Sequence, residues 1–257
     1  MKALLVVAGH DPSYRIGWGA GVDADREAAE RFGVEARCVV TARTDQDGTR
    51  VRALGARPVA EWVGEARAAA QAPFQALKSG LLPGAAHVRA LAALLSELDP
   101  GRTLPVVVDP VLAASGGELF LDDEGVRVLL EELVPLGVVL TPNLPEAARL
   151  TGRDPLALAA ARGARVDAAR ELLERGARAV VLKGGHADDA ELADLVLARG
   201  AEPVWLARPR TRGARLHGSG CRHASALAAG LALGQPLPAA AAAAAAWLGE
   251  LLTSRPA

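Results

Sequence analysis

Residues 105–150 read PVVVDPVLAASGGELFLDDEGVRVLLEELVPLGVVLTPNLPEAARL and carry the pattern that decides the fold. Two short apolar runs, Pro105–Asp109 and Val138–Thr141, predict strands, and each is followed by a helical segment, at Asp122–Leu133 and Leu144–Leu150. Continuously apolar strands are typical of a parallel sheet that is covered on both faces. This stretch therefore predicts successive β–α units packed around a central sheet.

The same alternation extends in both directions along the chain. Further strands are predicted at Ala3–Ala8, Ala36–Thr41, Gln75–Lys78, Ala179–Lys183, Leu192–Ala198 and Val204–Ala207. Further helices are predicted at Gly19–Phe32, Val59–Ala70, Ala85–Leu98, Val166–Arg175, Ser219–Leu233 and Ala239–Leu251. We expect a doubly wound α/β sandwich with strict β–α alternation, and one domain over residues 1–257, because no linker or shift in composition divides the chain.

The composition excludes several classes of protein. With 51% hydrophobic and 23% charged residues, the chain has the profile of a folded globular protein. Its net charge of −1 argues against a nucleic-acid-binding or membrane-surface protein, which would show a basic excess. Cys38 and Cys221 predict neither a disulfide framework nor a zinc site, and indicate a reducing cytoplasm. The Ala-rich stretch at residues 238–247 is too short to span a membrane.

Polar residues and glycines follow several predicted strands. Ligands of such sheets bind beyond the carboxyl ends of the strands. We therefore expect the site at the edge formed by Gly9–Ser13, Asp109–Pro110, Thr141–Asn143 and Lys183–His186.

Lysine is scarce in this chain. Of the 29 basic residues, only Lys2, Lys78 and Lys183 are lysines. An ammonium group is compact, whereas a guanidinium group is planar and wide. We interpret Lys78 and Lys183 as positions where a compact positive charge is required.

The strongest chemical signal is His217-Gly218-Ser219-Gly220-Cys221, which opens a predicted helix. Glycines let the backbone approach a ligand, and the free N–H groups of a helix start bind anions. Such a site would stabilise a phosphoryl group in transfer, with Cys221 in the first turn as a base of lowered pKa. The alternative is a glycine-rich loop with a small buried cysteine.

Other candidates carry structural alternatives of their own. Asn143 and Glu146 would hold a hydrated Mg²⁺, or would simply form a helix-capping box. Asp109 would serve the metal or the nucleophile, or would end a strand in a turn. Lys183 would reach a polyphosphate, or would be a solvated strand end. No P-loop, dinucleotide fingerprint, nucleophile elbow or zinc-protease motif is present in the sequence.

Taken together, these blocks resemble a known family over nearly the whole chain. The chain is similar to the hydroxymethylpyrimidine/phosphomethylpyrimidine kinases of thiamin biosynthesis, within the ribokinase-like superfamily. Pyridoxal kinases share some of the blocks, so they stay an alternative. The blocks that carry the resemblance are AGHDPS (8–13), GAGVDAD (19–25), LKSGLL (77–82), VVVDPVLAASG (106–116), LTPNLPEA (140–147), VLKGGH (181–186) and HGSGC (217–221).

The resemblance implies a three-layer α/β/α fold, the use of Mg²⁺ and ATP, and a small heterocyclic alcohol as substrate. Because members of this family are often dimers, it also implies a homodimer as the candidate assembly. It implies that the backbone of Gly218, Ser219 and Gly220 forms an anion hole beside Cys221 as base. It further implies that Lys183 contacts ATP phosphates, with Asn143, Glu146 and Asp109 around the Mg²⁺ and phosphates. By the same resemblance, the substrate would lie against Gly9, Asp25, Gln46, Leu81 and Val111.

Several positions depart from the family pattern. Residues Tyr14–Trp18 are extra, and we interpret them as a lid. Arg26 and Ala114 stand where the family has lysines, the segment Gly213–Leu216 lacks the usual polar run, and no lysine stands near Ala245. Missing lysines weaken a phosphate-bearing substrate more than a neutral one, so the first phosphorylation is better supported than the second.

Three functions are compatible with these residues. The first is phosphorylation of 4-amino-5-hydroxymethyl-2-methylpyrimidine, with its monophosphate as second substrate. The second is a pyridoxal or pyridoxine kinase of vitamin B6 salvage. The third, motivated by the departures, is a catalytically weak paralogue that binds the pyrimidine.

Overall fold

The computed structural model describes residues 1–12, 19–46, 51–114, 117–185, 192–208 and 216–254. Within them, one ten-stranded sheet runs in the order β10-β9-β8-β7-β6-β5-β1-β3-β4, with β2 paired to β1. The strands are β1 (Ala3–Asp11), β2 (Ala20–Gly21), β3 (Glu35–Gln46), β4 (Val51–Ala56), β5 (Ala76–Ser79), β6 (Val106–Val108), β7 (Val139–Leu140), β8 (Ala179–Leu182), β9 (Leu192–Ala198) and β10 (Val204–Arg208).

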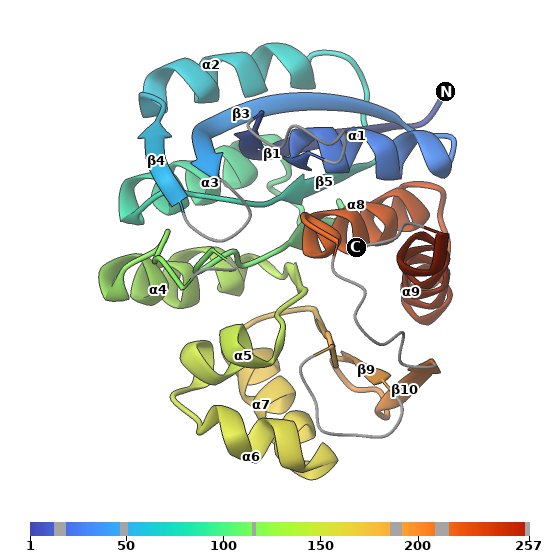
Figure 1. Ribbon diagram of the computed structural model, residues 1–257. Coiled ribbons are helices and arrows are strands. Elements are labelled where there is room, and N and C mark those ends of the chain that lie inside the picture. Colours follow the sequence, from blue (N-terminus) through green and yellow to red (C-terminus); the bar gives the residue numbers. More distant parts are fainter. Residues whose placement is uncertain (13–18, 47–50, 115–116, 186–191, 209–215, 255–257) are drawn as a thin grey trace.

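Helices cover both faces of this sheet, as the apolar strands predicted (Figure 1). One layer holds α1 (Val22–Arg31), α8 (Ser219–Ala232) and α9 (Leu237–Ser254), and it packs on a core that includes Leu4, Val6 and Val107. The other layer packs on a core that includes Leu5, Val7 and Val108. It contains α2 (Val59–Ala70), α3 (Ala85–Leu98), α4 (Asp123–Val128), η1 (Leu129–Leu133), η2 (Val134–Leu136), α5 (Leu144–Thr151), α6 (Pro155–Ala160) and α7 (Arg162–Glu174).

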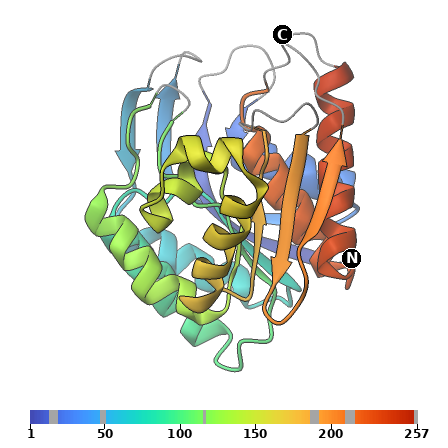
Figure 2. The ribbon, with the colours of Figure 1, turned by 90° about the horizontal axis from the view of Figure 1, so that it is seen from below.

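The centre of the sheet is parallel, but strict β–α alternation is wrong. Strands β3, β1, β5, β6, β7 and β8 form successive parallel pairs. Antiparallel strands extend both edges of the sheet. At one edge β8, β9 and β10 follow one another without an intervening helix, and at the other edge β4 pairs with β3. In Figure 2 these two extensions lie on opposite sides of the molecule, with α9 beside β10.

Several predicted boundaries shift, and three short strands or α-helices were missed. The helix expected from Gly19 begins at Val22, because Ala20 and Gly21 pair with the end of β1. The helix expected at Val166–Arg175 begins earlier, at Arg162. The missed elements are β2, β4 and α6, although the Asp154 side chain caps α6 by accepting from the N–H of Leu156 at 3.0 Å.

Helix α9 is longer than the sequence predicted. Among the described residues it is the one helix long and apolar enough, by length and composition, to cross a membrane. Its buried residues Ala240, Ala241, Ala244 and Trp247 belong to the core that it shares with α8. Packing against α8 therefore accounts for the apolar residues on one face of the helix.

The strand register brings the predicted site residues to one edge. Ser79 lies opposite Val108, and Val108 lies opposite Leu140. Asn143 and Lys183 form a parallel bridge beyond β7 and β8. The segments that follow β5, β6, β7 and β8 therefore lie side by side at their carboxyl ends.

Candidate active site

Asp109 and Lys183 form an ion pair at the centre of this edge. The Lys183 Nζ lies 2.8 Å from Oδ1 of Asp109, which also accepts from the Thr141 hydroxyl at 3.2 Å. Burial raises the pKa of the Asp109 carboxyl, but Lys183 and Lys78 outweigh it and hold that pKa below its usual value. Burial lowers the pKa of Lys183, and its acidic neighbours more than compensate. The interpretation of Lys183 as a solvated strand end is wrong, because only 13% of its side chain is exposed to solvent.

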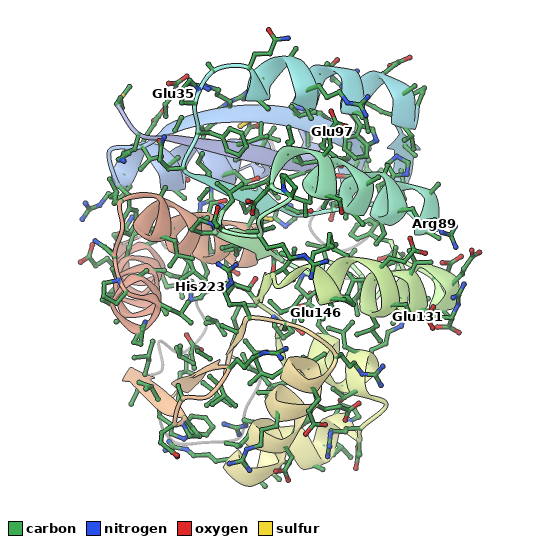
Figure 3. All side chains as sticks on the ribbon, turned by 180° about the vertical axis from the view of Figure 1, so that it is seen from behind. Glu35, Arg89, Glu97, Glu131, Glu146 and His223 are labelled. Atoms are coloured by element: carbon green, nitrogen blue, oxygen red, sulfur yellow. The ribbon has the colours of Figure 1, made fainter. Side chains whose placement is uncertain are left out.

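Asn143 and Glu146 form the capping box at the start of α5. The Asn143 Oδ1 accepts from the Glu146 N–H at 2.8 Å, and the Glu146 Oε2 accepts from the Asn143 N–H at 2.7 Å. Burial raises the pKa of the Glu146 carboxyl to about 7, with Lys183 lowering it and Asp109 raising it. In Figure 3, Glu146 lies near the middle of the view and Glu131 near its edge. The capping interpretation is confirmed, and the same carboxylate lies within the electrostatic range of the Asp109–Lys183 pair.

A second, fully buried ion pair lies behind the first. The Lys78 Nζ, at the end of β5, donates to Oδ1 of Asp25 on α1 at 2.8 Å, and the Ser225 hydroxyl of α8 donates to the same oxygen at 2.7 Å. Burial raises the pKa of Asp25 more than Lys78 and Ser225 lower it. Burial lowers the pKa of Lys78, yet the negative field of Asp25 raises it overall. Oδ2 of Asp25 has no protein partner among the described residues.

The glycine motif opens α8 directly against the central ion pair. Gly218 precedes the helix with a left-handed φ of 72°. A Cβ placed on Gly220 would lie 3.3 Å from the Lys183 Nζ and 3.5 Å from Oδ2 of Asp109. The Ser219 N–H donates to the Leu216 carbonyl at 3.1 Å. The next two backbone N–H groups of this helix start, those of Gly220 and Cys221, therefore adjoin a site that already holds a cation and a carboxylate.

The pKa expected for Cys221 is wrong in direction. The thiol lies in the first turn of α8, where a helix start by itself lowers a thiol pKa. Burial raises the pKa of the Cys221 thiol more than the nearby Lys78 and the Gly21 N–H lower it. The thiol is therefore neutral at rest around neutral pH, and a proton acceptor at this position must be formed during the reaction.

The predicted substrate residues fall into two groups. Leu81 and Val111 pack into one small apolar cluster with Ala42 and Phe120. A Cβ on Gly9 would lie 2.7 Å from a Leu81 methyl group, so glycine lets β1 approach this cluster.

Gln46 lies near the same cluster, whereas Asp25 does not. Gln46 is the register partner of Val51, which packs against the apolar cluster, and its amide donates to the Thr44 hydroxyl at 3.1 Å. Asp25 lies apart in its buried pair with Lys78. Contact between Asp25 and a substrate stays a prediction, and Oδ2 is the atom that would accept a hydrogen bond from it.

Several features lie outside the described residues: the expected lid Tyr14–Trp18, Ser115-Gly116, His186 and Gly213–Arg215. Arg26 is described, and it donates to Asp23 at 3.3 Å on an exposed surface. Ala245 is buried in α9.

Sequence reasoning missed four residues that build the site. Lys78 was signalled by the scarcity of lysine alone. The structure places Lys78 and Lys183 in ion pairs with Asp25 and Asp109, and the requirement for a compact positive charge there stays a prediction. Thr141 and Ser225 had no local signal for their roles. His217 was quoted within the motif, but its pairing with Oδ2 of Asp11 at 2.9 Å joins positions far apart in sequence.

Mg²⁺ fits this donor set. The described residues contain no group of three or more His, Cys, Asp or Glu side chains that would hold a metal alone. Protein-bound Mg²⁺ usually takes one or two carboxylates together with substrate phosphates and water. The Asp109 carboxylate raises the pKa of the Glu146 carboxyl, and a bound cation would relieve this repulsion between the two groups.

The comparisons with known proteins agree with this geometry. The sequence model of the phosphomethylpyrimidine kinase family matches residues 16–257. The chain is 37% identical over 246 residues to the hydroxymethylpyrimidine/phosphomethylpyrimidine kinase of Streptomyces coelicolor, covering 92% of this chain and 83% of that one. It is 39% identical over 236 residues to the thiamine biosynthesis bifunctional protein ThiED of Geobacter sulfurreducens, covering 91% of this chain but about half (46%) of that longer protein.

Comparison with solved structures identifies the fold. The pyridoxal kinase of Staphylococcus aureus in complex with AMP-PCP and pyridoxal superposes with a TM-score of 0.83 at 25% identity, covering 97% of this chain and 87% of that one. The fold is therefore ribokinase-like, as the resemblance implied. On the family match, the relatives and the fold, this chain is a kinase that belongs to the phosphomethylpyrimidine kinase family.

Proposed function

We propose that this kinase transfers the γ-phosphoryl group of ATP to the hydroxymethyl group of 4-amino-5-hydroxymethyl-2-methylpyrimidine, in thiamine biosynthesis. One observation carries the proposal: the glycine-rich start of α8 lies against the buried Asp109–Lys183 pair. Phosphoryl transfer depends mainly on positioning and on stabilising charge. Backbone N–H groups, an ammonium group and two carboxylates in one place supply both.

Each residue then has a distinct task. The backbone N–H groups of Gly220 and Cys221, at the start of α8, would bind the transferring phosphoryl oxygens, and Lys183 would bind the phosphates of ATP. Asp109 and Glu146 would hold Mg²⁺, which when bound neutralises the phosphate charge. Cys221 would act as a base only in its thiolate form, which the ammonium group of Lys78 favours and which forms by loss of the thiol proton to solvent. The thiolate would then take the hydroxyl proton of the substrate as the new oxygen–phosphorus bond forms and the bond from the γ-phosphorus to the departing ADP breaks.

The substrate is the part of the proposal that rests on the relatives. The kinase of Streptomyces coelicolor is named for the hydroxymethylpyrimidine and for its phosphate. An apolar wall at Leu81 and Val111 suits the face of an aromatic heterocycle. The buried Ala245 and the Asp23-bound Arg26 supply no free cation for a second phosphate group, so we propose faster turnover of the alcohol than of the monophosphate.

A panel of ATP turnover assays with Mg²⁺ tests the proposal. The acceptors are the hydroxymethylpyrimidine, its monophosphate and pyridoxal. Turnover of the pyrimidine alcohol well above that of pyridoxal supports the proposal. Turnover of pyridoxal alone transfers the chain to the vitamin B6 alternative, which the structural likeness to a pyridoxal kinase favours. Tight pyrimidine binding without turnover supports the weak paralogue.

We further propose a cytoplasmic homodimer. Both cysteines are free in the structure, which suits a reducing compartment. Within the described part of the chain, strand β4 ends the sheet and is mostly exposed, so its outer edge is available to a second copy. Light scattering after size-exclusion chromatography distinguishes a dimer from a monomer.

A further inference from the structure

Arg222 directly follows Cys221, and its guanidinium group is buried, with 1% of the residue exposed. Nε donates to Oε2 of Glu27 on α1 at 2.8 Å, and Nη2 lies 2.7 Å from the same oxygen. Nη1 donates to the backbone carbonyl of His217 at 2.8 Å. One side chain thus joins α1, α8 and the turn that precedes α8.

That turn is the one that aims the helix start. The carbonyl group held by Arg222 belongs to the residue before Gly218, whose φ of 72° is left-handed. A Cβ on Gly218 would lie 2.9 Å from Nη1 of Arg222, so the guanidinium group packs tightly on the turn. On the other side, His217 is held through its ring by Asp11 of β1.

The Arg222–Glu27 pair also connects the two sides of the site. Glu27 lies on α1, two residues after Asp25, and Arg222 lies beside Cys221 on α8. Each helix therefore carries one proposed site residue and one member of the pair. Two nitrogens of one planar guanidinium group on the same carboxylate oxygen fix distance and orientation together, which a flexible ammonium group does not.

We propose that Arg222 is a positioning residue for phosphoryl transfer. Its guanidinium nitrogens bind Glu27 and the carbonyl group of His217. Anchored by Glu27, it holds the His217–Gly218 turn through that carbonyl group, so that the backbone N–H groups at the start of α8 meet the transferring phosphoryl group at the required distance. The inference rests on the proposed kinase function, and it holds for whichever alcohol the enzyme accepts.

The test compares two buried arginines. The variants are Arg222→Met, Arg222→Lys and Glu27→Gln, and the matched control is Arg165→Met. Arg165 is also fully buried and donates to the carbonyl groups of Leu158 at 2.7 Å and Ala159 at 2.6 Å, at α6 and α7. Each variant is measured for Tm, for kcat, for KM of ATP and for hydrogen exchange of the peptide covering residues 216–221.

We expect Arg222→Met and Glu27→Gln to lower kcat by about 10- to 100-fold, since misplacement of about 1 Å costs about 100-fold, while KM for ATP changes less than about threefold. Arg222→Lys should fall between wild type and Arg222→Met, because lysine pairs with Glu27 without the fork. Exchange at 216–221 should rise in Arg222→Met. Arg165→Met should lower Tm, with kcat and this exchange close to wild type.

Two results would overturn the inference. One is a kcat of Arg222→Met within about twofold of wild type, matching the control while Tm falls. The other is unchanged exchange at 216–221. If wild type turns over none of the three acceptors, the proposed function fails, and the exchange measurement still decides whether Arg222 holds the turn.

Discussion

Replacing Lys78 with methionine tests the buried ion pair behind the site. The substitution removes the ammonium group that lies 2.8 Å from Oδ1 of Asp25 and leaves the carboxyl group in a place with no exposure. Ser225 then remains as a donor to that oxygen. Removing one partner of a buried pair typically costs about 3–5 kcal/mol, because a buried charge loses its compensation.

The loss should depend on pH, with a definite sign. Burial already raises the pKa of Asp25, and without Lys78 that pKa rises further. A carboxyl group whose folded-state pKa is raised contributes its stability below its unfolded pKa, and this contribution is lost as pH rises through the folded pKa. The deficit of Lys78→Met relative to wild type should therefore grow from pH 5 to pH 8, by up to about 1.4 kcal/mol for each pH unit.

Urea unfolding at pH 5, 6.5 and 8, followed by circular dichroism, measures this difference, with the m-value as a check that the unfolding transition is comparable. The matched variant is the double change Lys78→Met with Asp25→Asn. The asparagine side chain is neutral, and its oxygen still accepts from Ser225. The double variant should therefore recover more than half of the lost stability and show little pH dependence. A deficit below about 1 kcal/mol at pH 8, or one equal at pH 5 and pH 8, would refute a desolvated charged pair.

Three further changes test the site. Gly220→Ala should lower kcat by about 100-fold or more with little change in stability, because the new Cβ enters the space beside Lys183. Gly249→Ala, which has open space around it, is the control for both kcat and unfolding. Cys221→Ala should lower kcat by about 100-fold and flatten the rise of rate with pH expected for a thiol of raised pKa, as initial rates from pH 6.5 to 9 would show. Glu146→Gln should gain stability over wild type as pH rises from 5 to 8, by up to about 3 kcal/mol in metal-free urea unfolding, because the pKa of Glu146 is raised to about 7; an equal pH dependence in both proteins would contradict this.

Local patterns were sufficient for the central sheet and its helices. The apolar runs that became β6 and β7 have one stable place, between two layers of helices, so their burial follows from composition. The strands at the edges of the sheet were harder to predict from local patterns. Strand β4 reads VRALGA and is mostly exposed, so it lacks the alternation that marks a half-buried strand, and its pairing with β3 is what defines it.

The sequence by itself determined the α/β class, the edge where the site lies, and the motifs that place the chain in its family. Tertiary structure alone decided which charges meet and which protonation states they favour. Lys78 and Asp25 are 53 residues apart and pair only because α1 packs on β1, the sheet neighbour of β5. Cys221 has the local setting of a low-pKa thiol, yet burial raises its pKa. Desolvation and ion pairing depend on everything that surrounds a group, whereas a sequence pattern records only its neighbours along the chain.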